Sequence, residues 1–298
     1  MGYVFVVAAM LIWGSVGIFG RWADQPATVI VLYRVLSAFA VLGLYQIVRG
    51  GGLRRAWQEG AGQYGWVLFG GVVLALNWIF FFQAVQMTSM ANAVLSYYVA
   101  PVLVTVLAPL VLKEKLERRT LIFVGMAFLG TLIMNPLGEV GGDHLLGMLS
   151  GLTAAFFYAM VTISGKKVTG MQAHTLVLWQ TGTASVVLLP YVLWQGMALP
   201  SLGSLGVMVS IGVVHTALAL TLYFLGLNRV KVQHVGVLGY LDPVSAILFA
   251  YLFFAEAPSM ETWIGGSLIL VSSYLILRSK ETGGSLDGSE EKAQNATG

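Results

Sequence analysis

Two short stretches decide the fold of this chain: Tyr98-Val99-Ala100-Pro101 and, 142 residues later, Tyr240-Leu241-Asp242-Pro243. Each lies in the middle of a long apolar run and places a tyrosine three residues before a proline. A fixed offset that recurs in several segments indicates an internal duplication. Further pairs at the same offset are Phe82 with Phe224, Glu114 with Glu256, and Thr120 with Thr262.

The composition places the chain in a membrane. Of its 298 residues, 57% are hydrophobic and only 10% are charged, and the mean hydropathy is +0.82. A soluble domain carries about 25% charged residues, so a cytosolic enzyme or a nucleic-acid-binding protein is excluded as the class. The sequence contains no cysteine, which excludes disulfides, thiolate catalysis and cysteine-based metal sites.

Apolar runs of about 17 to 24 residues predict membrane-spanning helices. We therefore predict an all-α, polytopic membrane protein with ten transmembrane helices. Their ranges are 3–20, 27–48, 64–86, 91–112, 119–135, 145–165, 173–195, 204–227, 232–254 and 260–278. Residues 279–298 are rich in Gly, Ser and Glu with almost no large apolar side chain, which predicts a disordered tail.

The basic residues predict the orientation. If the N-terminus is cytoplasmic, 14 of the 16 Lys and Arg residues lie in the inner loops or the C-terminal segment. The outer loops hold Arg21 alone, and Arg34 lies inside the second span. Such a bias over short loops follows the positive-inside rule. We predict that both termini, and hence the tail, are cytoplasmic, in a bacterial-type plasma (inner) membrane.

The repeat divides the chain into residues 1–138 and 139–278, with five spans in each half. Because five is odd, the second copy must cross the membrane in the opposite sense. Inverted repeats are the architecture of secondary transporters, in which a site near the midplane is exposed alternately to either side. The sequence thus predicts a transporter that works by alternating access.

The same conclusion follows from a resemblance. The residues that carry it are Leu11-Ile12-Trp13-Gly14-Ser15, Arg34, Pro101, Lys113-Glu114-Lys115-Leu116, Ala155-Phe156-Phe157-Tyr158-Ala159, Pro243 and Glu256. With these residues the chain resembles the ten-helix members of the drug/metabolite transporter superfamily that are built from two EamA domains. The resemblance implies a central cavity lined mainly by spans 1, 3, 4, 6, 8 and 9, and export of small metabolites, often amino acids.

This chain departs from the family pattern in two respects. Glu256 is followed by Ala257-Pro258, whereas Glu114 is followed by Lys115, so the ends of the two repeats are not interchangeable. The small four-helix relatives carry a coupling carboxylate in their first helix, and the first span here has none. Their coupling mechanism cannot be carried over.

Asp242 is the only acidic residue in the interior of any span. A carboxylate there needs a partner, water or a proton, which suggests a proton-coupling site or a counter-charge for a substrate amine. The alternative is a structural hydrogen bond near Pro243 or an ion pair. His215, in the middle of span eight, is the second candidate for proton coupling, with a neutral, hydrogen-bonded imidazole as its structural alternative.

Arg34 and the two central prolines have competing interpretations. Arg34 is able to bind a substrate carboxylate, but it is equally suited to snorkel to the headgroups or to serve the architecture, and we favour the structural role. Pro101 and Pro243 each remove a backbone donor. We interpret them as gating kinks, and a static kink is the alternative.

Aromatic and amide side chains far from the predicted membrane surfaces suit a partly apolar or cationic solute, since rings offer stacking and cation–π contacts. The residues predicted to bind substrate or line its pathway are Trp13, Asn77, Trp78, Tyr97, Tyr98, Tyr158, His215, Tyr240 and Asp242.

The predicted function is a secondary transporter that moves a small organic metabolite, most plausibly an exported amino acid. Its expected partners are that solute, the lipid bilayer and, as a candidate coupling ion, the proton, and we expect no nucleic acid. No spacing of His, Asp or Glu predicts a metal site, and Gly165-Lys166-Lys167 lacks the form of a phosphate-binding loop, so no cofactor is expected. The GxxxG pattern at Gly147 and Gly151 is compatible with a monomer or a homodimer. The alternatives are an integral-membrane enzyme or a non-transporting scaffold.

Overall fold

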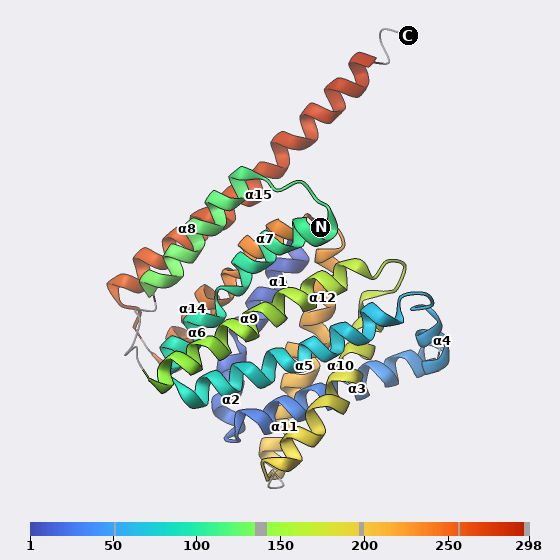
Figure 1. The fold of residues 1–298 in the computed structure, drawn as a ribbon, viewed down its shortest axis with the longest axis vertical. Helices are drawn as coiled ribbons and strands as arrows, with labels where there is room; N and C mark the ends of the chain where they lie inside the picture. Colours follow the sequence, from blue (N-terminus) through green and yellow to red (C-terminus); the bar gives the residue numbers. More distant parts are fainter. Residues whose placement is uncertain (51, 135–141, 197–199, 256, 295–298) are drawn as a thin grey trace.

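The structure, a computed structural model, describes residues 1–50, 52–134, 142–196, 200–255 and 257–294. Throughout these residues the chain forms helices, turns and short links without a β-strand (Figure 1). This arrangement follows from the bilayer, in which a spanning segment must satisfy its backbone groups internally. The predicted class, an all-α polytopic membrane protein, is confirmed.

The predicted spans all coincide with helices. Among the described residues, nine helices are long and apolar enough to cross a membrane. The remaining predicted span, 119–135, is α8, a helix of 17 residues that ends at Met134, the last residue described before Gly142. Six spans are single helices: α3 (Ala27–Val48), α5 (Tyr64–Met87), α8 (Arg118–Met134), α9 (Asp143–Lys167), α10 (Ala173–Trp194) and the first part of α15 (Met260–Gln294). A short helix that the sequence did not predict, α4 (Gly52–Gln58), follows α3.

Four spans are interrupted. They consist of α1 (Gly2–Gly14) with α2 (Val16–Ala23), α6 (Met90–Tyr97) with α7 (Ala100–Leu112), α11 (Leu202–Ser210) with the π-helix η1 (Ile211–Leu218) and α12 (Ala219–Leu227), and α13 (Val232–Gly239) with α14 (Leu241–Phe254). The sequence predicted continuous helices with kinks at two prolines. The structure instead breaks the helices, and each proline sits in the first turn of the following half-helix, where its missing N–H costs nothing.

The two broken helices that contain the prolines have the same backbone. Tyr98 and Tyr240, which cap α6 and α13, adopt φ −70°, ψ 3° and φ −73°, ψ −6°. At the far ends of α7 and α14, Lys113 and Ala255 are both left-handed, with φ of 59° and 54°. Both pairs are separated by the repeat offset. Non-glycine residues rarely adopt this left-handed conformation, so the duplication preserves even an unusual turn.

The packing of the helices is also repeated between the two halves. α5 packs on α9, and its counterpart α12 packs on α1. Two helices, α3 and α8, pack on their own counterparts α10 and α15, and the fourth span packs on its counterpart, the ninth, through α7 and α13. This pattern is that of two repeats related by an approximate twofold axis, and the inversion of the second copy stays a prediction. The predicted boundary between residues 138 and 139 lies outside the described residues, as does Glu256.

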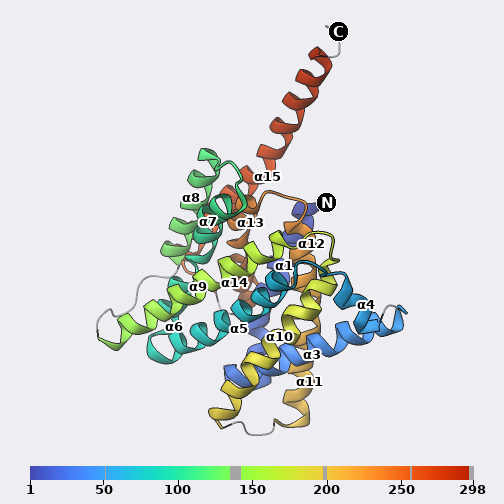
Figure 2. The same ribbon diagram turned by 45° about the vertical axis from the view of Figure 1, so that its right-hand side comes forward.

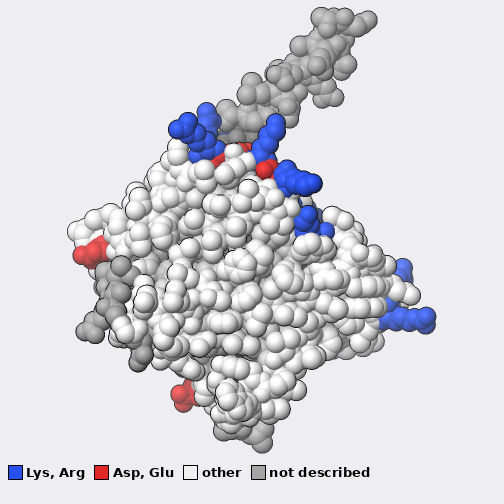
Figure 3. Space-filling view, viewed as in Figure 1, with Lys and Arg blue, Asp and Glu red and all other residues white. Residues whose placement is uncertain are grey.

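Lysine and arginine side chains gather at one end of the bundle (Figure 3). The N-terminus and the far end of α15 lie at this end (Figures 1 and 2). We call it the basic end and define it by Tyr3, the α7–α8 loop and the α12–α13 loop. That it faces the cytoplasm stays a prediction.

The last part of α15 differs from the composition-based expectation. The structure continues this helix to Gln294, whereas residues 279–298 were predicted to be disordered. Beyond the bundle the helix projects alone (Figure 1), so tertiary packing does not hold this polar segment. Disorder of the tail stays a prediction.

Candidate functional site: a cavity between the broken helices

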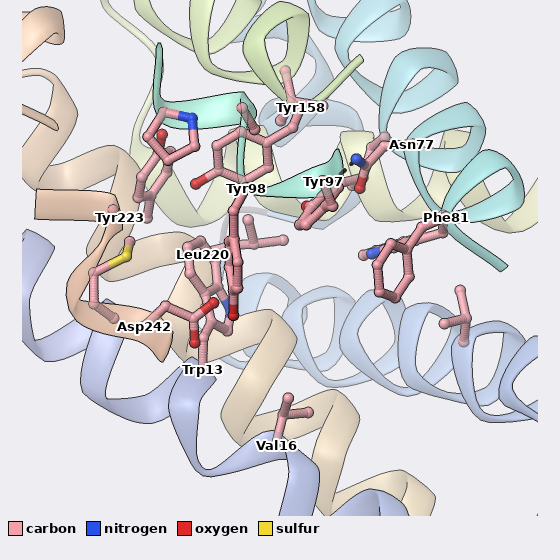
Figure 4. Close-up of a pocket in the computed structure, with 18 of the residues that line it drawn as sticks. Trp13, Val16, Asn77, Phe81, Tyr97, Tyr98, Tyr158, Leu220, Tyr223 and Asp242 are labelled. Atoms are coloured by element: carbon pink, nitrogen blue, oxygen red, sulfur yellow. Dashed lines mark hydrogen bonds between the residues drawn. The ribbon is translucent and has the colours of Figure 1, made fainter. Parts of the chain in front are cut away.

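A cavity of about 250 Å³ lies where the interrupted helices meet (Figure 4). All six spans implied by the family resemblance contribute to it, and so does α3, the second span. Its lining residues are Met10, Trp13, Val16, Val31, Arg34, Leu74, Asn77, Trp78, Phe81, Phe82, Tyr97, Tyr98, Ala100, Pro101, Tyr158, Val161, Leu220, Tyr223, Gly239 and Asp242.

Eight of the twenty lining residues are aromatic, and five of their rings contact one another in a chain. The ring centroid of Trp13 lies 5.3 Å from that of Tyr223, which lies 6.4 Å from Tyr158. Tyr158 continues to Tyr97 at 6.0 Å, and Tyr97 to Phe81 at 4.9 Å. These separations and the tilted geometries are those of favourable aromatic pairs. The wall is therefore rigid, apolar and suited to cover a flat or aliphatic solute.

Asp242 supplies the negative charge of the cavity. It lies in the first turn of α14, immediately after the helix break. The positive end of a helix dipole favours a carboxylate at that position. Figure 4 shows its carboxylate beside Trp13 and the ring of Tyr98. Within the described part of the chain, no ion pair joins Asp242 to Arg34, so both charges remain available to a solute.

Arg34 lines the cavity and is also anchored. Its Nε donates to Thr216 Oγ1 at 2.9 Å, and one terminal nitrogen donates to the carbonyl of His215 at 3.3 Å. Its guanidinium carbon lies 5.0 Å from the ring of Trp78, a cation–π contact. The bonds to η1 are compatible with the favoured structural role, and the position of Arg34 in the lining is compatible with contact to a solute.

The structure places His215 behind the wall and not in it. Its side chain is fully buried, Nε2 lies 2.9 Å from Ser15 Oγ, and its ring packs edge-on against Phe19 at 4.8 Å. Its backbone carbonyl accepts a hydrogen bond of 2.8 Å from Trp13 Nε1. The imidazole faces the α1–α2 junction because η1 packs there, and a mid-span position in the sequence does not reveal that direction.

Tyr240 is likewise absent from the lining. Its side chain is fully buried, and its hydroxyl donates to the carbonyl of Tyr98 at 2.9 Å. Tyr98 and Tyr240 occupy corresponding positions in the two repeats, yet only Tyr98 lines the cavity. Of the two predicted hinge prolines, Pro101 lines the cavity, whereas Pro243 is buried and does not.

Asn77 lines the cavity, as the sequence suggested, and it also links α5 to α9. Its Nδ2 donates to the carbonyl of Ala154 at 2.8 Å and lies 3.4 Å from Tyr97 Oη. Sequence reasoning missed its neighbour Phe81, which is one helical turn further along α5. Because Asn77 and Phe81 are four residues apart, their side chains lie on one face of the helix. This spacing is the signal from which Phe81 could have been predicted to line the cavity. Tyr223, on α12, was also missed.

Catalytic and metal chemistry have few candidates here. Within the described residues, no group of three or more His, Asp or Glu side chains could hold a metal ion. The lining brings together one carboxylate, one guanidinium, one amide and several phenols among aromatic rings. Such groups are suited to a small polar molecule with an apolar part.

A cavity between the apolar helices of two repeated halves is the arrangement of membrane transporters. A family model described as the EamA-like transporter family matches residues 1–135 and again 145–278. The chain therefore belongs to the EamA-like transporter family, within the drug/metabolite transporter superfamily. It is a multi-pass membrane protein.

Individual relatives agree with this assignment. The uncharacterized transporter YxxF of Bacillus subtilis (strain 168) is 29% identical over 91% of this chain and 88% of its own length. The pseudopaline exporter CntI of Pseudomonas aeruginosa (strain UCBPP-PA14) is 26% identical over 87% and 89%. A solved crystal structure superposes with a TM-score of 0.82 at 20% identity, covering 92% of this chain and 96% of that one. That likeness shows the fold.

Proposed function

We propose that this protein is a secondary transporter that exports a small zwitterionic metabolite, an amino acid or a related solute, by alternating access between its two repeats. The observation that carries the proposal is the cavity with Asp242 and Arg34 in its wall and no ion pair between them. Asp242 pairs with the ammonium group, Arg34 with the carboxylate, and the rings cover the apolar part.

The size of the cavity supports a small solute. A cavity of about 250 Å³ suits a single metabolite of amino-acid size. CntI, a relative of similar length, is named as the exporter of a metabolite, and this supports the outward direction.

An integral-membrane enzyme is the weaker alternative. The relatives named here are transporters, and the charged groups of the cavity are spread over separate helices with no nucleophile and base in contact. A scaffold without transport would have no use for charged groups in a central cavity.

The first test is thermal unfolding of the detergent-purified protein with a panel of about a hundred metabolites. A solute at roughly 100 times its Kd stabilises the native state by about 2.7 kcal/mol. We expect stabilisation by amino acids and none by the matching amines or carboxylic acids that lack one charge. Stabilisation by a solute class without an ammonium group would contradict the proposed role of Asp242.

Two isosteric variants make this test specific. Asp242→Asn should remove the stabilisation, because the amide cannot neutralise an ammonium group. Asp24→Asn is the matched control: Asp24 is exposed at the end of α2 with φ of 46°, a conformation that asparagine tolerates, so its response should equal that of the wild type.

Proteoliposomes with an imposed pH gradient decide the coupling. If the protein exchanges the solute for protons, the imposed gradient drives solute transport by the wild-type protein, whereas Asp242→Asn, which no longer binds the solute, transports it neither with nor without the gradient. If the protein is a uniporter, the gradient has no effect in either protein.

A further inference from the structure

A polar network closes the basic end of the bundle. Glu117, in the loop between α7 and α8, accepts a hydrogen bond from Lys231 Nζ at Oε1 and from His234 Nε2 at Oε2, the latter at 3.2 Å. His234 Nδ1 lies 2.6 Å from the hydroxyl of Tyr3. Because an ionised carboxylate only accepts, Nε2 carries the proton, and the Tyr3 hydroxyl donates to Nδ1. The network links α1, the α7–α8 loop and α13.

A buried amide fixes the loop of this network by its backbone. Gln233 is fully buried; its Nε2 donates to the carbonyl of Lys115 at 2.9 Å, and its Oε1 accepts from the Glu117 amide at 3.0 Å. A two-pronged bond of this kind specifies one position of the loop relative to α13. Breaking it inside the protein would leave two buried polar atoms unpaired.

The network lies beyond the closed end of the cavity. On α1 the cavity is lined by Met10, and Val6 and then Tyr3 follow toward the basic end. On α13 the cavity residue Gly239 is followed in the same direction by Val235. At 1.5 Å per residue, Tyr3 lies about 10 Å from the level of Met10.

The intervening layer is tightly packed. Val6 and Leu227 are fully buried and Val235 is 2% exposed. A side-chain carbon added to Gly226 would lie 2.8 Å from the carbonyl oxygen of Gly2, so α1 and α12 are in backbone contact. A solute could pass between α1 and α12 toward the basic end only if these two helices separated.

The opposite end lacks the equivalent charges. At the repeat offset, Glu117 corresponds to Ser259, Lys231 to Ser89, and His234 to Asn92. Ser89 and Ser259 accept from backbone amides in the first turns of the helices they precede. The Glu117 network therefore has no charged counterpart at these three positions of the opposite end, although the fold is repeated.

We propose that Glu117 is the centre of a gate that holds the basic end closed. Alternating access requires Glu117 to release Lys231 and His234, so that α1 and α13 separate from the α7–α8 loop and the cavity opens to this side. The gate sets the resting state of the transporter with the basic end shut. This inference rests on the proposed function, because a gate has a role only where a solute crosses.

The test uses the natural absence of cysteine. Val161→Cys places a thiol of similar size in the cavity wall. A membrane-impermeant, charged methanethiosulfonate is applied to right-side-out and to inside-out vesicles. With the native gate, we expect labelling from the opposite end alone. Adding Glu117→Gln or Lys231→Gln should raise the labelling rate from the basic end at least tenfold.

Two further variants separate gating from damage to the fold. Lys115→Gln removes one charge from the same loop but keeps the backbone carbonyl that Gln233 binds, so its labelling should equal that of the native gate. The charge-reversed pair Glu117→Lys with Lys231→Glu should restore closure relative to either change alone.

The outcomes distinguish the two proposals. Labelling from the opposite end in every variant, with no gain from the basic end, would overturn the gate and leave the transport pathway in place. Labelling from neither side in any variant would overturn the solute pathway itself, and the gate with it.

Discussion

The two halves of this protein share a backbone and differ in chemistry. Both carry a helix break capped by a tyrosine, Tyr98 or Tyr240, and both end the following half-helix in a left-handed residue. Yet the residue that opens α7 is Ala100, and its counterpart in α14 is Asp242. The repeated sequence explains why the two halves fold alike, and a position at which the halves differ supplies the carboxylate of the cavity.

The largest expected effect comes from making the two breaks chemically alike. Ala100→Asp places a second carboxylate in the same cavity, and a charged side chain in the membrane interior costs roughly 2.5–3.5 kcal/mol. We expect a clear drop in the thermal unfolding temperature of the purified protein. Ala100→Ser is the control for size. An unchanged unfolding temperature in Ala100→Asp would show that the cavity tolerates charge at either break.

A smaller effect distinguishes the two capping tyrosines. Tyr240→Phe leaves the carbonyl of Tyr98 without its hydroxyl donor, and an unpaired buried acceptor costs ~1–3 kcal/mol. Tyr98→Phe removes a hydroxyl that faces the cavity, so it should affect solute binding more than stability. Thermal unfolding with and without the solute found by the panel measures both. Equal loss of stability in the two variants would contradict the assignment of Tyr240 to the framework.

The smallest effect concerns the basic end. Burial would raise the pKa of Glu117, but hydrogen bonds from Lys231 and His234 outweigh it and hold that pKa below its usual range. Glu117 therefore stabilises the folded state above its ordinary pKa of about 4.3, and this contribution is lost as pH falls through the lowered pKa. A partly exposed pair of this kind contributes less than ~1 kcal/mol.

The measurement is the gap in unfolding temperature between the wild type and Glu117→Gln. It should be constant from neutral pH to about pH 5 and close at lower pH. Lys231, His234 and the nearby Glu114 are the other titratable groups that act on this cluster. Ser259→Ala, at the corresponding position of the other end, should show a gap that does not change with pH. A gap for Glu117→Gln that does not change as pH falls through the acidic range would contradict the lowered pKa.

The spans were predictable because hydropathy acts locally, and the inverted repeat because the offset is constant along the chain. The positions of the helix breaks were less accessible. Pro101 and Pro243 marked the region, but a proline suits the first turn of a new helix better than the middle of an old one. The break therefore falls before each proline, at the tyrosine.

The site residues could be predicted only where the position of a residue along its helix also indicates which way its side chain points. Trp13, Asn77 and Asp242 lie in the cavity as the sequence suggested. His215 and Tyr240 do not, because the side of a helix that faces the centre depends on packing with distant segments. The network of Glu117 was missed for the same reason: Glu117 and His234 are 117 residues apart in the chain, and neither is unusual in a loop or near a membrane surface.

The hydrogen bond from Tyr240 to the carbonyl of Tyr98 joins a residue to its own symmetry mate. A contact between mates lies on the rotation axis that relates them, because the axis passes through their midpoint. A point on that axis is unchanged when the two repeats exchange conformations. Tyr98 and Tyr240 would therefore remain neighbours in a state that opens to the other side.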